Sequence, residues 1–499
     1  METAAGDNAK MWKKGLIALV LLAVAALGIF LFRLAHEPLL DYDEAAYAEL
    51  VRETAASGNI LALKFMGGNW FDKPPLFYWL AMAAEKLPVS AEFAMRLPSA
   101  LASVAAVLLT YLIGLELTRS KRAAFISAAM LLTTAGFVEA GRQARPDALV
   151  LAFILLAFWG FARGLMRENA SRWFLLFGAG VGLAVMTKDA IGLLAYLFAC
   201  AAALAFQKWD WLWSKYFWLG QLLAAAIAAP WHAYMTAEFG ASFWKTYILT
   251  HVFMRYETNL IGNNTSILTY VWYLADYASP WIVLFLVGII ALFAFRRFGG
   301  ANRPAHLMLL LSALGVFALF SAASTKIPFY LLPMLPFVAL FAGMIAHEAL
   351  SAFRPRWRKW FAGFLVACFA GAFALAIYRG YDLDPSFNIE HRLAGDERSI
   401  GLILASDGTD LPIRFADPIY WETIRFYSRG RQLGSFDPAA AYGAPFLLVV
   451  PTYKVNHYPY FETLAADSEI IFKGDYFTLM KIGGGSSGMP DSAQGSAGI

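Results

Sequence analysis

Apolar runs long enough to cross a lipid bilayer recur along most of this 499-residue sequence. The first run, Gly15–Phe32, follows Lys10, Lys13 and Lys14 and has no small-residue cleavage site after it. It therefore predicts an uncleaved membrane anchor with a cytoplasmic N-terminus. With the runs that follow, the sequence predicts about 11 to 13 transmembrane helices. The later runs lie near 97–117, 123–140, 148–163, 173–187, 190–206, 217–235, 272–295, 306–323, 329–347 and 360–378.

The composition supports this reading. Hydrophobic residues make up 60% of the chain and charged residues 15%, which is more apolar surface than a water-soluble core could bury. The net charge of +4 gives no reason to expect a nucleic-acid partner. The two cysteines, Cys200 and Cys368, lie inside apolar runs, so the sequence predicts neither a disulfide framework nor a cysteine metal site.

Lysine and arginine gather in alternate connections between the predicted spans, as expected for cytoplasmic loops. The opposite, outer face then holds the long loop 33–96, the shorter connections near 142–147, 188–189 and 324–328, and the loop 237–271. An odd number of spans places the C-terminal segment on that outer face as well. The basic connections are Arg119–Arg122, Arg163–Arg172, Lys208–Lys215, Arg296–Arg303 and Arg354–Lys359.

The chain divides into a transmembrane region, 1–379, and a small mixed α/β domain, 380–483, on the outer side. The last residues, 484–499, are rich in Gly and Ser and are expected to be disordered. Alternating apolar residues bounded by Asp, Gly and Pro predict the strands of the α/β domain, and a helix is expected at 418–428. The predicted strands are 400–405, 444–450, 469–472 and 476–482.

The first outer loop, 33–96, has the highest concentration of candidate functional residues in the chain. It contains the segment Asn69–Leu80, Asn-Trp-Phe-Asp-Lys-Pro-Pro-Leu-Phe-Tyr-Trp-Leu. The two prolines restrict the backbone and hold Asp72 and Lys73 in an extended geometry beside aromatic rings. A lysine at a membrane surface suits the phosphate of a lipid whose tail lies in the bilayer, and Asp72 beside it is a candidate metal ligand.

Three acidic residues lie about 30 residues upstream of this segment. Asp43 is the best candidate for the base that accepts a proton from an attacking hydroxyl. Asp41 and Glu44 also suit N-terminal capping of the following helix, and Glu44 is kept as a second catalytic candidate.

Two further outer connections add candidates. Asp147, at the head of a predicted membrane helix, is costly unless it is paired, so a catalytic role is favoured, with Arg145 as its nearest partner. Lys326 and Tyr330 provide a second cation and a hydroxyl for a phosphate.

The outer loop 237–271 holds His251 and Arg255. One histidine together with Asp72 could hold a divalent cation, such as zinc, magnesium or manganese, with open coordination positions. His232 is a lower-ranked alternative. Arg255 is a further candidate for the donor phosphate.

These groups suit one kind of reaction. Breaking a sugar–phosphate bond develops negative charge on the phosphate, which cations or a metal stabilise, while a carboxylate deprotonates the acceptor. A single displacement would invert the anomeric centre. The sequence has no glycine-rich nucleotide-binding loop, so the sugar is expected on another kind of carrier.

The motifs also resemble a known family. Asp43-Glu44, Phe71–Leu80, Ala144–Asp147 and Lys326–Pro333 are similar, in order and placement, to the bacterial 4-amino-4-deoxy-L-arabinose transferases of lipid A, which are related to protein O-mannosyltransferases. The resemblance implies a GT-C fold with juxtamembrane helices in the first outer loop and a periplasmic C-terminal domain.

For the site, the resemblance implies that Asp43 and Asp147 are essential acids and that Lys73 and Tyr330 contact the lipid phosphate. It also implies that Asp72 and His251 sit where a divalent ion is held. Family members commonly have Glu at the position of Asp72 and Arg at the position of Ala46, and these departures leave the sugar and the acceptor open.

The expected function is therefore that of a glycosyltransferase of the bacterial inner membrane. It would move aminoarabinose or a related sugar from polyprenyl (undecaprenyl) phosphate to a periplasmic-face acceptor, such as lipid A or another envelope glycolipid or glycan. A protein O-mannosyltransferase is one alternative. A flippase for lipid-linked sugars is another, but it predicts charges near span centres and inverted repeats, whereas this chain has its charges at span ends.

Overall fold

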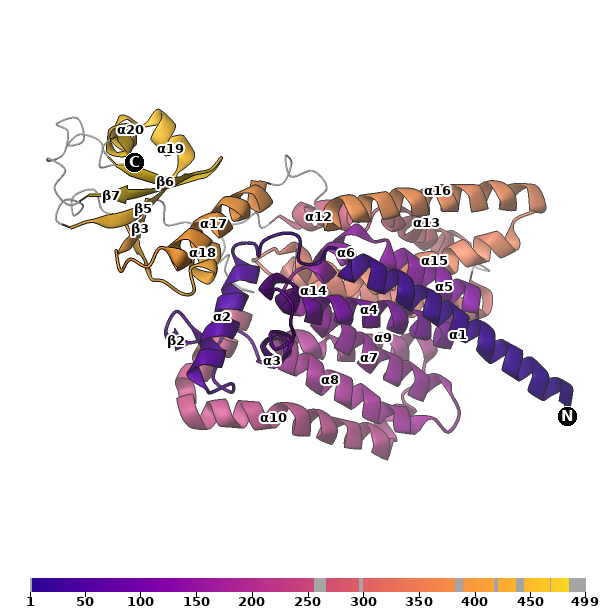
Figure 1. The fold of residues 1–499 in the computed structure, drawn as a ribbon. Helices are drawn as coiled ribbons and strands as arrows, with labels where there is room; N and C mark the ends of the chain where they lie inside the picture. Colours follow the sequence, from indigo (N-terminus) through magenta and orange to yellow (C-terminus); the bar gives the residue numbers. More distant parts are fainter. Residues whose placement is uncertain are drawn as a thin grey trace.

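The computed structural model describes residues 2–254, 266–295, 299–381, 389–416, 421–436, 444–466 and 468–483. They form a bundle of long helices with a small α/β domain at one end, and α1 begins at the opposite end (Figure 1). The bundle helices are α1 (Glu2–Leu31), α4 (Ala91–Thr118), α5 (Lys121–Leu132), α6 (Ala135–Arg142), α7 (Pro146–Met166), α8 (Phe174–Lys188), α9 (Leu194–Phe206), α10 (Lys215–Trp244), η4 (Lys245–Met254), α12 (Ile267–Tyr277), α13 (Trp281–Ala294), α14 (Arg303–Ala322), η6 (Pro328–Met334), α15 (Leu335–Ala352) and α16 (Pro355–Gly380).

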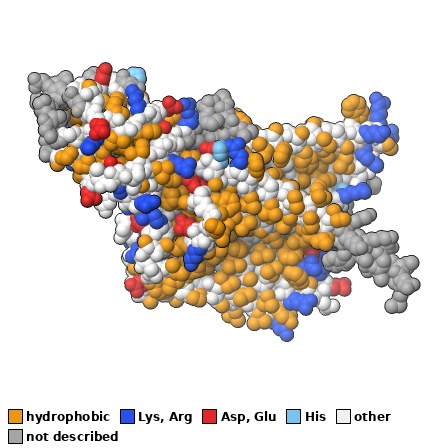
Figure 2. Space-filling view, viewed as in Figure 1, with side chains coloured by type: hydrophobic (Ala, Val, Ile, Leu, Met, Phe, Trp, Pro, Cys, Tyr) orange, Lys and Arg blue, Asp and Glu red, His pale blue; other side chains and the backbone are white. Residues whose placement is uncertain are grey.

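The bundle has the lengths and the surface of a multi-pass membrane protein. Among the described residues, six helical stretches could cross a membrane by length and composition, or eight if each of two bent pairs counts as one span. Figure 2 shows hydrophobic side chains covering the middle of the bundle, with Lys and Arg gathered toward its ends. That distribution is the one expected of helices that pass through lipid.

Several predicted spans are interrupted, which explains why fewer than 11 to 13 are counted. The run 123–140 breaks into α5 and α6 with a bend of 62°, and 272–295 breaks into α12 and α13 with a bend of 111°. The stretch Ser171–Phe206 counts once, although the backbone of Asp189 leaves the helical region at φ 40°, ψ −129°.

Small residues let the central helices approach closely. A Cβ atom on Gly178 of α8 would lie 1.8 Å from the carbonyl oxygen of Gly220 on α10. On its other side, a Cβ on Gly180 would lie 2.6 Å from the backbone nitrogen of Ala157 on α7. Glycine at these positions therefore sets the distance between α7, α8 and α10, as small residues do between membrane helices.

The loop between α1 and α4 forms its own small structure, as expected. It contains α2 (Asp43–Ser57), the hairpin of β1 (Lys64–Phe65) and β2 (Gly68–Asn69), and α3 (Leu76–Ala84). Figure 1 shows α2 and α3 against the end of the bundle that faces the α/β domain. Asp43 is thus the first residue of a helix that lies over the helix ends.

The C-terminal domain has a five-stranded mixed sheet in the order β4-β3-β5-β7-β6, with β3 parallel to β4 and β5, and β7 antiparallel to β5 and β6. Alternate residues of β5 pack on opposite faces: Leu447 and Val449 join the core under α17 and α18, while Phe446 and Leu448 join the core under α19 and α20. Its elements are α17 (Ile389–Ser406), β3 (Ile413–Phe415), α18 (Glu422–Tyr427), β4 (Leu433–Ser435), β5 (Phe446–Pro451), α19 (Thr452–His457), α20 (Pro459–Ala466), β6 (Glu469–Lys473) and β7 (Phe477–Ile482).

The prediction of a mixed α/β domain is confirmed, but the strand predicted at 400–405 is wrong. These residues belong to α17, where Ile400 and Leu404 are four residues apart and share the buried face. The described part of the predicted helix 418–428 contains α18. The predicted tail, 484–499, lies outside the described residues.

Candidate active site

A cavity of about 690 Å³ lies at the end of the bundle beneath the loop between α1 and α4. Its walls come from segments that are far apart in the sequence: the loop before α2, the loop carrying Asp72, the start of α7, the end of α8, η4 and η6. Most of the polar residues predicted from the sequence line it. The lining residues include Asp41, Asp43, Glu44, Tyr47, Asp72, Lys73, Glu139, Gln143, Arg145, Asp147, Lys188, His251 and Tyr330.

Arg145 joins the two acids that were the strongest catalytic candidates. Its Nη1 pairs with Oδ2 of Asp43, and its Nε lies 3.5 Å from Oδ2 of Asp147. The other carboxylate oxygen of Asp147 accepts a hydrogen bond of 2.6 Å from Lys188. The two carboxylates raise the pKa of Arg145 despite its burial. The site therefore contains an alternating row of charges, Asp43, Arg145, Asp147 and Lys188.

A second polar group lies across the cavity. The Lys73 ammonium donates to the hydroxyl of Tyr47 at 2.6 Å and to Oδ2 of Asp72 at 3.1 Å. On the other oxygen of Asp72, Nδ1 of His251 lies at 2.6 Å. Lys73 and Asp72 are both buried, at 8% and 6% exposed. Asp72 and Lys73 lie at bends of the chain and not in the extended geometry predicted for them, and both side chains line the cavity.

A second cavity, of about 300 Å³, shares the residues Asp72, Lys73, Lys188, His251 and Tyr330 with the first. Its remaining walls are mostly apolar. They are formed by Asp189, Ala190, Ile191, Leu194, Leu319, Phe320 and Ala323. The two lysines therefore stand where a polar chamber meets an apolar one, which suits an anionic headgroup attached to a hydrocarbon tail.

Glu44, the second catalytic candidate, is held differently from Asp43. Its carboxylate accepts hydrogen bonds from the backbone N–H groups of Leu40 and Ala144 and from Nε and Nη2 of Arg96, at 2.5–3.1 Å. Burial opposes ionisation, but Arg96 and these hydrogen bonds more than offset it, so the pKa of Glu44 lies below its usual value. This arrangement fits a clamp between α2, α4 and the loop before α7 better than a proton acceptor.

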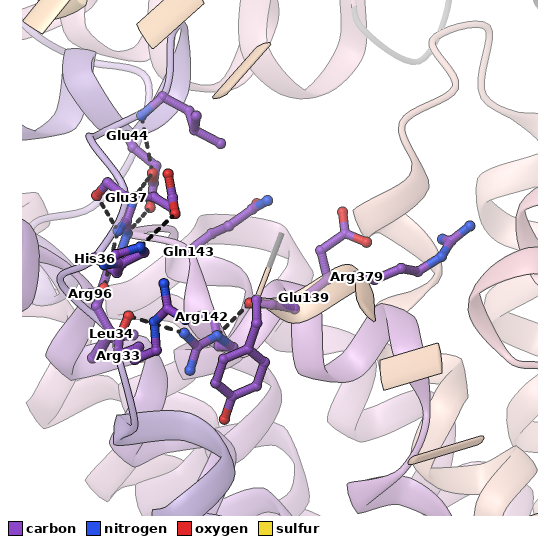
Figure 3. Close-up of a pocket in the computed structure, with 13 residues that line it drawn as sticks. Arg33, Leu34, His36, Glu37, Glu44, Arg96, Glu139, Arg142, Gln143 and Arg379 are labelled. Atoms are coloured by element: carbon purple, nitrogen blue, oxygen red, sulfur yellow. Dashed lines mark hydrogen bonds and ion pairs between the residues drawn. The ribbon is translucent and has the colours of Figure 1, made fainter. Parts of the chain in front are cut away.

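A smaller pocket of about 50 Å³ adjoins the main cavity behind Glu44, Glu139 and Gln143. Figure 3 shows the Arg142 guanidinium in this pocket, between Arg33 and Glu139 in that view. Its donors go to backbone carbonyls at the ends of helices, Ile29 and Phe32 by α1 and Gly380 of α16. Arg142 therefore caps the negative ends of two helix dipoles.

Of the remaining candidates that lie within the described residues, only Tyr330 lines a cavity wall. Tyr330 lines both cavities, and its ring lies under the Lys188 ammonium at 5.6 Å. Lys326 lines neither; its ammonium donates to the backbone carbonyls of Ser321 and Ala323. A phosphate contact by Lys326 would require these bonds to open. His232 bonds to Ala228 and Tyr247 and is absent from both cavity walls, and Arg255 lies outside the described residues.

Asp72 and His251 meet, as the predicted metal site requires, but they are only two ligands. No group of three His, Cys, Asp or Glu side chains suited to a metal ion occurs within the described ranges. Nδ1 of His251 lies 2.6 Å from Oδ1 of Asp72, so a cation shared by these two atoms would need its other ligands from outside the pair. One imidazole and one carboxylate suit an ion such as Zn²⁺ or Mn²⁺ better than Mg²⁺, which prefers oxygen ligands.

The sequence did not predict several lining residues, among them Lys188 and Tyr47, which contact the charged groups. Lys188 ends an apolar run and is followed by Asp189, a signal that resembles the head of any membrane helix. Tyr47 lies one turn after Asp43 on α2, so its inward direction follows from helical spacing once Asp43 is placed. Both are buried, and both contact charged residues of the cavity.

The chain is similar to proteins whose names describe transferases that use lipid-linked sugars. Residues 15–247 match the family described as dolichyl-phosphate-mannose-protein mannosyltransferase. Two curated proteins are named undecaprenyl phosphate-alpha-4-amino-4-deoxy-L-arabinose arabinosyl transferase. The one from Erwinia tasmaniensis is 28% identical over 64% of this chain and 57% of its own length. The one from Pseudomonas savastanoi pv. phaseolicola is 30% identical over 66% and 61%.

The chain thus spans about three fifths of the length of these relatives. At the level of structure the match is more complete. The crystal structure of ArnT from Cupriavidus metallidurans bound to undecaprenyl phosphate has a TM-score of 0.70 at 19% identity, covering 94% of this chain and 99% of that one. The resemblance seen in the sequence motifs is confirmed, and the fold is the GT-C fold.

Proposed function

Since residues 15–247 carry a domain of the dolichyl-phosphate-mannose-protein mannosyltransferase family and the chain has the GT-C fold, we propose that this protein is a polyprenyl-phosphate-dependent glycosyltransferase. The observation that carries the proposal is the junction of the two cavities. There, Lys73 and Lys188 stand between a polar chamber with Asp43 and Asp147 and an apolar chamber.

In this reading the lipid tail of the donor lies in the apolar cavity and its phosphate lies between Lys73, Lys188 and Arg145. These cations stabilise the negative charge that develops on the leaving phosphate. Tyr47 and Tyr330 offer hydroxyl groups beside them. Cations held in place by the protein are effective here because, unlike water, they do not have to reorganise as the charge develops.

Asp43 is the proposed base. At 30% exposed, its side chain is more accessible than those of Asp72 and Asp147, so an acceptor hydroxyl can reach it. The acceptor oxygen forms a bond to the anomeric carbon while the bond from that carbon to the phosphate oxygen breaks. The electron pair goes to the phosphate and the hydroxyl proton to Asp43, with inversion at the anomeric carbon. A divalent ion held by Asp72 and His251 would add positive charge beside the phosphate.

The proposed donor is an undecaprenyl-phosphate-linked aminoarabinose or a related sugar, supported by the names of the curated relatives. The proposed acceptor is an envelope glycolipid such as lipid A. The matching family model is described by a protein acceptor, so a protein O-glycosyltransferase is the second candidate, and an acceptor panel distinguishes the two.

We further place the protein in the bacterial inner membrane, with a cytoplasmic N-terminus and a periplasmic C-terminal domain. Support comes from basic side chains at the end of the bundle away from the cavity. Arg163 and Arg167 there pair with Glu116. Basic connections favour the cytoplasmic side.

The test is transfer of a radiolabelled sugar from polyprenyl phosphate to lipid A, other envelope glycolipids or protein by the purified protein. Asp43→Asn should abolish transfer while donor binding is retained, and Lys73→Ala should weaken donor binding. Asp210→Asn, a change in the connection between α9 and α10, is the matched control and should keep full activity. If the wild type transfers nothing, and liposomes instead show lipid translocation that survives Asp43→Asn, the protein is a flippase.

A further inference from the structure

The C-terminal domain holds the loop that leads into Asp43. The backbone N–H and the hydroxyl of Thr423, in α18, both lie 2.7 Å from Oδ1 of Asp41. The same hydroxyl lies 3.3 Å from the carbonyl oxygen of Leu39. One threonine of the α/β domain thus binds the side chain and the backbone of the residues just before the proposed base.

Tyr427, one turn further along α18, binds the same loop. Its hydroxyl accepts a hydrogen bond of 3.1 Å from the backbone N–H of Leu39 and donates one of 2.8 Å to Glu92 of α4. Thr423 is fully buried and Tyr427 is 8% exposed. The loop is therefore tied through one hydroxyl group to a long helix of the bundle.

The other side of α18 binds α2, the helix that begins at Asp43. Arg425 lies 3.2 Å from Glu49 and 3.2 Å from Glu53, and Glu49 also accepts from Arg52. Figure 1 shows α18 beside the end of α2. Both the residues before Asp43 and the helix after it are consequently held by a single short helix from the other domain.

We propose that Thr423 and Tyr427 are positioning residues, which fix the Leu39–Asp43 turn so that the Asp43 carboxylate faces the reaction cavity. The proposal rests on the proposed function, because it assigns Asp43 the role of base. If these residues hold the turn, the C-terminal domain contributes to catalysis by positioning Asp43. Leu39–Tyr42 is not part of a helix or strand, so its conformation depends on such external bonds.

The catalytic consequence follows from distance. A base must lie within hydrogen-bond reach of the hydroxyl it deprotonates, and a displacement of about 1 Å can reduce the rate about 100-fold. The donor phosphate binds to Lys73, Arg145 and Lys188, none of which contacts α18 through the bonds described above. Loosening the turn should therefore lower kcat without raising the KM for the donor, since Arg145, once released from Asp43, is still available to bind the phosphate.

The experiment uses the full-length protein in lipid nanodiscs with the variants Thr423→Val, Thr423→Ser and Tyr427→Phe. Valine keeps the shape of threonine and the backbone hydrogen bond but loses the hydroxyl, whereas serine keeps the hydroxyl. The matched control is Thr452→Val, a buried threonine of the same domain that bonds only within it, to Gly474 and Thr478. Hydrogen exchange of the peptide containing Leu39 reports the loop directly.

We expect Thr423→Val and Tyr427→Phe each to lower kcat about tenfold, with no rise in the KM for the donor and with faster exchange at Leu39. Thr423→Ser should recover most of the rate, and Thr452→Val should match the wild type in kcat even if its thermal stability falls. The inference is overturned if Thr423→Val keeps the wild-type kcat, or if kcat falls in Thr452→Val as it does in Thr423→Val.

Failure of the proposed function gives a different pattern. In that case the wild type itself shows no transfer with any donor, and the inference falls with it. Turnover by the wild type that survives Thr423→Val refutes the positioning role alone and leaves the transferase intact.

Discussion

The guanidinium of Arg145 pairs with the carboxylate of Asp43, although the two residues are separated by most of α2, α3 and α4 to α6 in the chain. The same guanidinium contacts Asp147. A donor phosphate entering between the cations would compete with Asp43 for Arg145. Binding of the donor would then release the base at the moment when the acceptor hydroxyl needs it.

Replacing Arg145 by Lys tests this relationship. The planar guanidinium of arginine can contact two carboxylates and a phosphate at once, whereas a lysine ammonium cannot. We therefore expect kcat to fall roughly 10- to 100-fold, with a smaller effect on donor binding. Single-turnover transfer measures the chemical step. Arg163→Lys, which alters the pair with Glu116 away from the cavity, is the matched control and should stay near wild type. A wild-type rate in Arg145→Lys would exclude the proposed competition.

The ion pair between Asp147 and Lys188 should dominate the local stability. Removing one partner of a buried pair typically costs about 3–5 kcal/mol because the other charge is left buried. Lys188→Met and Asp147→Asn should each lower the melting temperature and abolish turnover. The double variant should regain much of the lost stability, but it should remain inactive. Thermal unfolding in detergent, alongside transfer, measures both effects.

The double variant is the decisive member of this set. If it is as unstable as the sum of the single variants, the two side chains do not form a coupled pair. If it transfers sugar at the wild-type rate, neither residue takes part in donor binding or chemistry.

A divalent ion between Asp72 and His251 gives a third prediction. Chelation should stop transfer, and Mg²⁺, Mn²⁺ or Zn²⁺ should restore it, because the two residues supply one carboxylate and one imidazole. His251→Ala should raise the metal concentration needed for half-maximal activity. His232→Ala, which alters a histidine outside the cavity, is the control. Full activity after exhaustive chelation would show that the lysines and Arg145 suffice.

The sequence predicts which residue types form the site better than it predicts which of them contact one another. Asp43, Asp72, Lys73 and Asp147 are recognisable because charged residues at the ends of apolar spans are costly unless they have a role. Glu44 is adjacent to Asp43 in the chain, but successive residues of a helix point about 100° apart, so it faces Arg96 instead. No local pattern distinguishes such a clamp from a base.

The fold shows the same limit. Long runs such as 97–117 and 148–163 mark helices reliably, since the bilayer sets their length. Bends such as that between α5 and α6, and the contact of α18 with the Asp43 loop, depend on packing between distant segments. Hydropathy contains no information on them, which is why these bends and the contact of α18 could not be predicted.

The proposed orientation can be tested by labelling. Cys200 and Cys368 are first replaced by Ala, and single cysteines are then introduced at the exposed positions Ser435 and Arg122. A membrane-impermeant maleimide added to intact spheroplasts should modify Ser435→Cys and leave Arg122→Cys unmodified until the membrane is opened. The reverse pattern would place the C-terminal domain in the cytoplasm and exclude a periplasmic acceptor.

The buried carboxyl of Asp41 predicts a pH dependence of the contact between the domains. Burial, opposed by the hydrogen bonds of Thr423, raises the pKa of Asp41 from 3.8 to about 7, and Glu422 adds to the increase. Glu397, which faces Asp41 from α17, has a pKa raised in the same direction by burial and by Asp41.

Because the pKa of Asp41 is higher in the folded protein than in the unfolded chain, its contribution to stability is complete below pH 3.8 and is lost as the pH rises through about 7. The wild type should therefore lose thermal stability relative to Asp41→Asn between about pH 4 and pH 7. Asparagine keeps an acceptor for Thr423 but cannot ionise. Melting temperatures of both proteins across this range measure the difference, and parallel curves would mean that Asp41 does not change its charge at the interface between the domains.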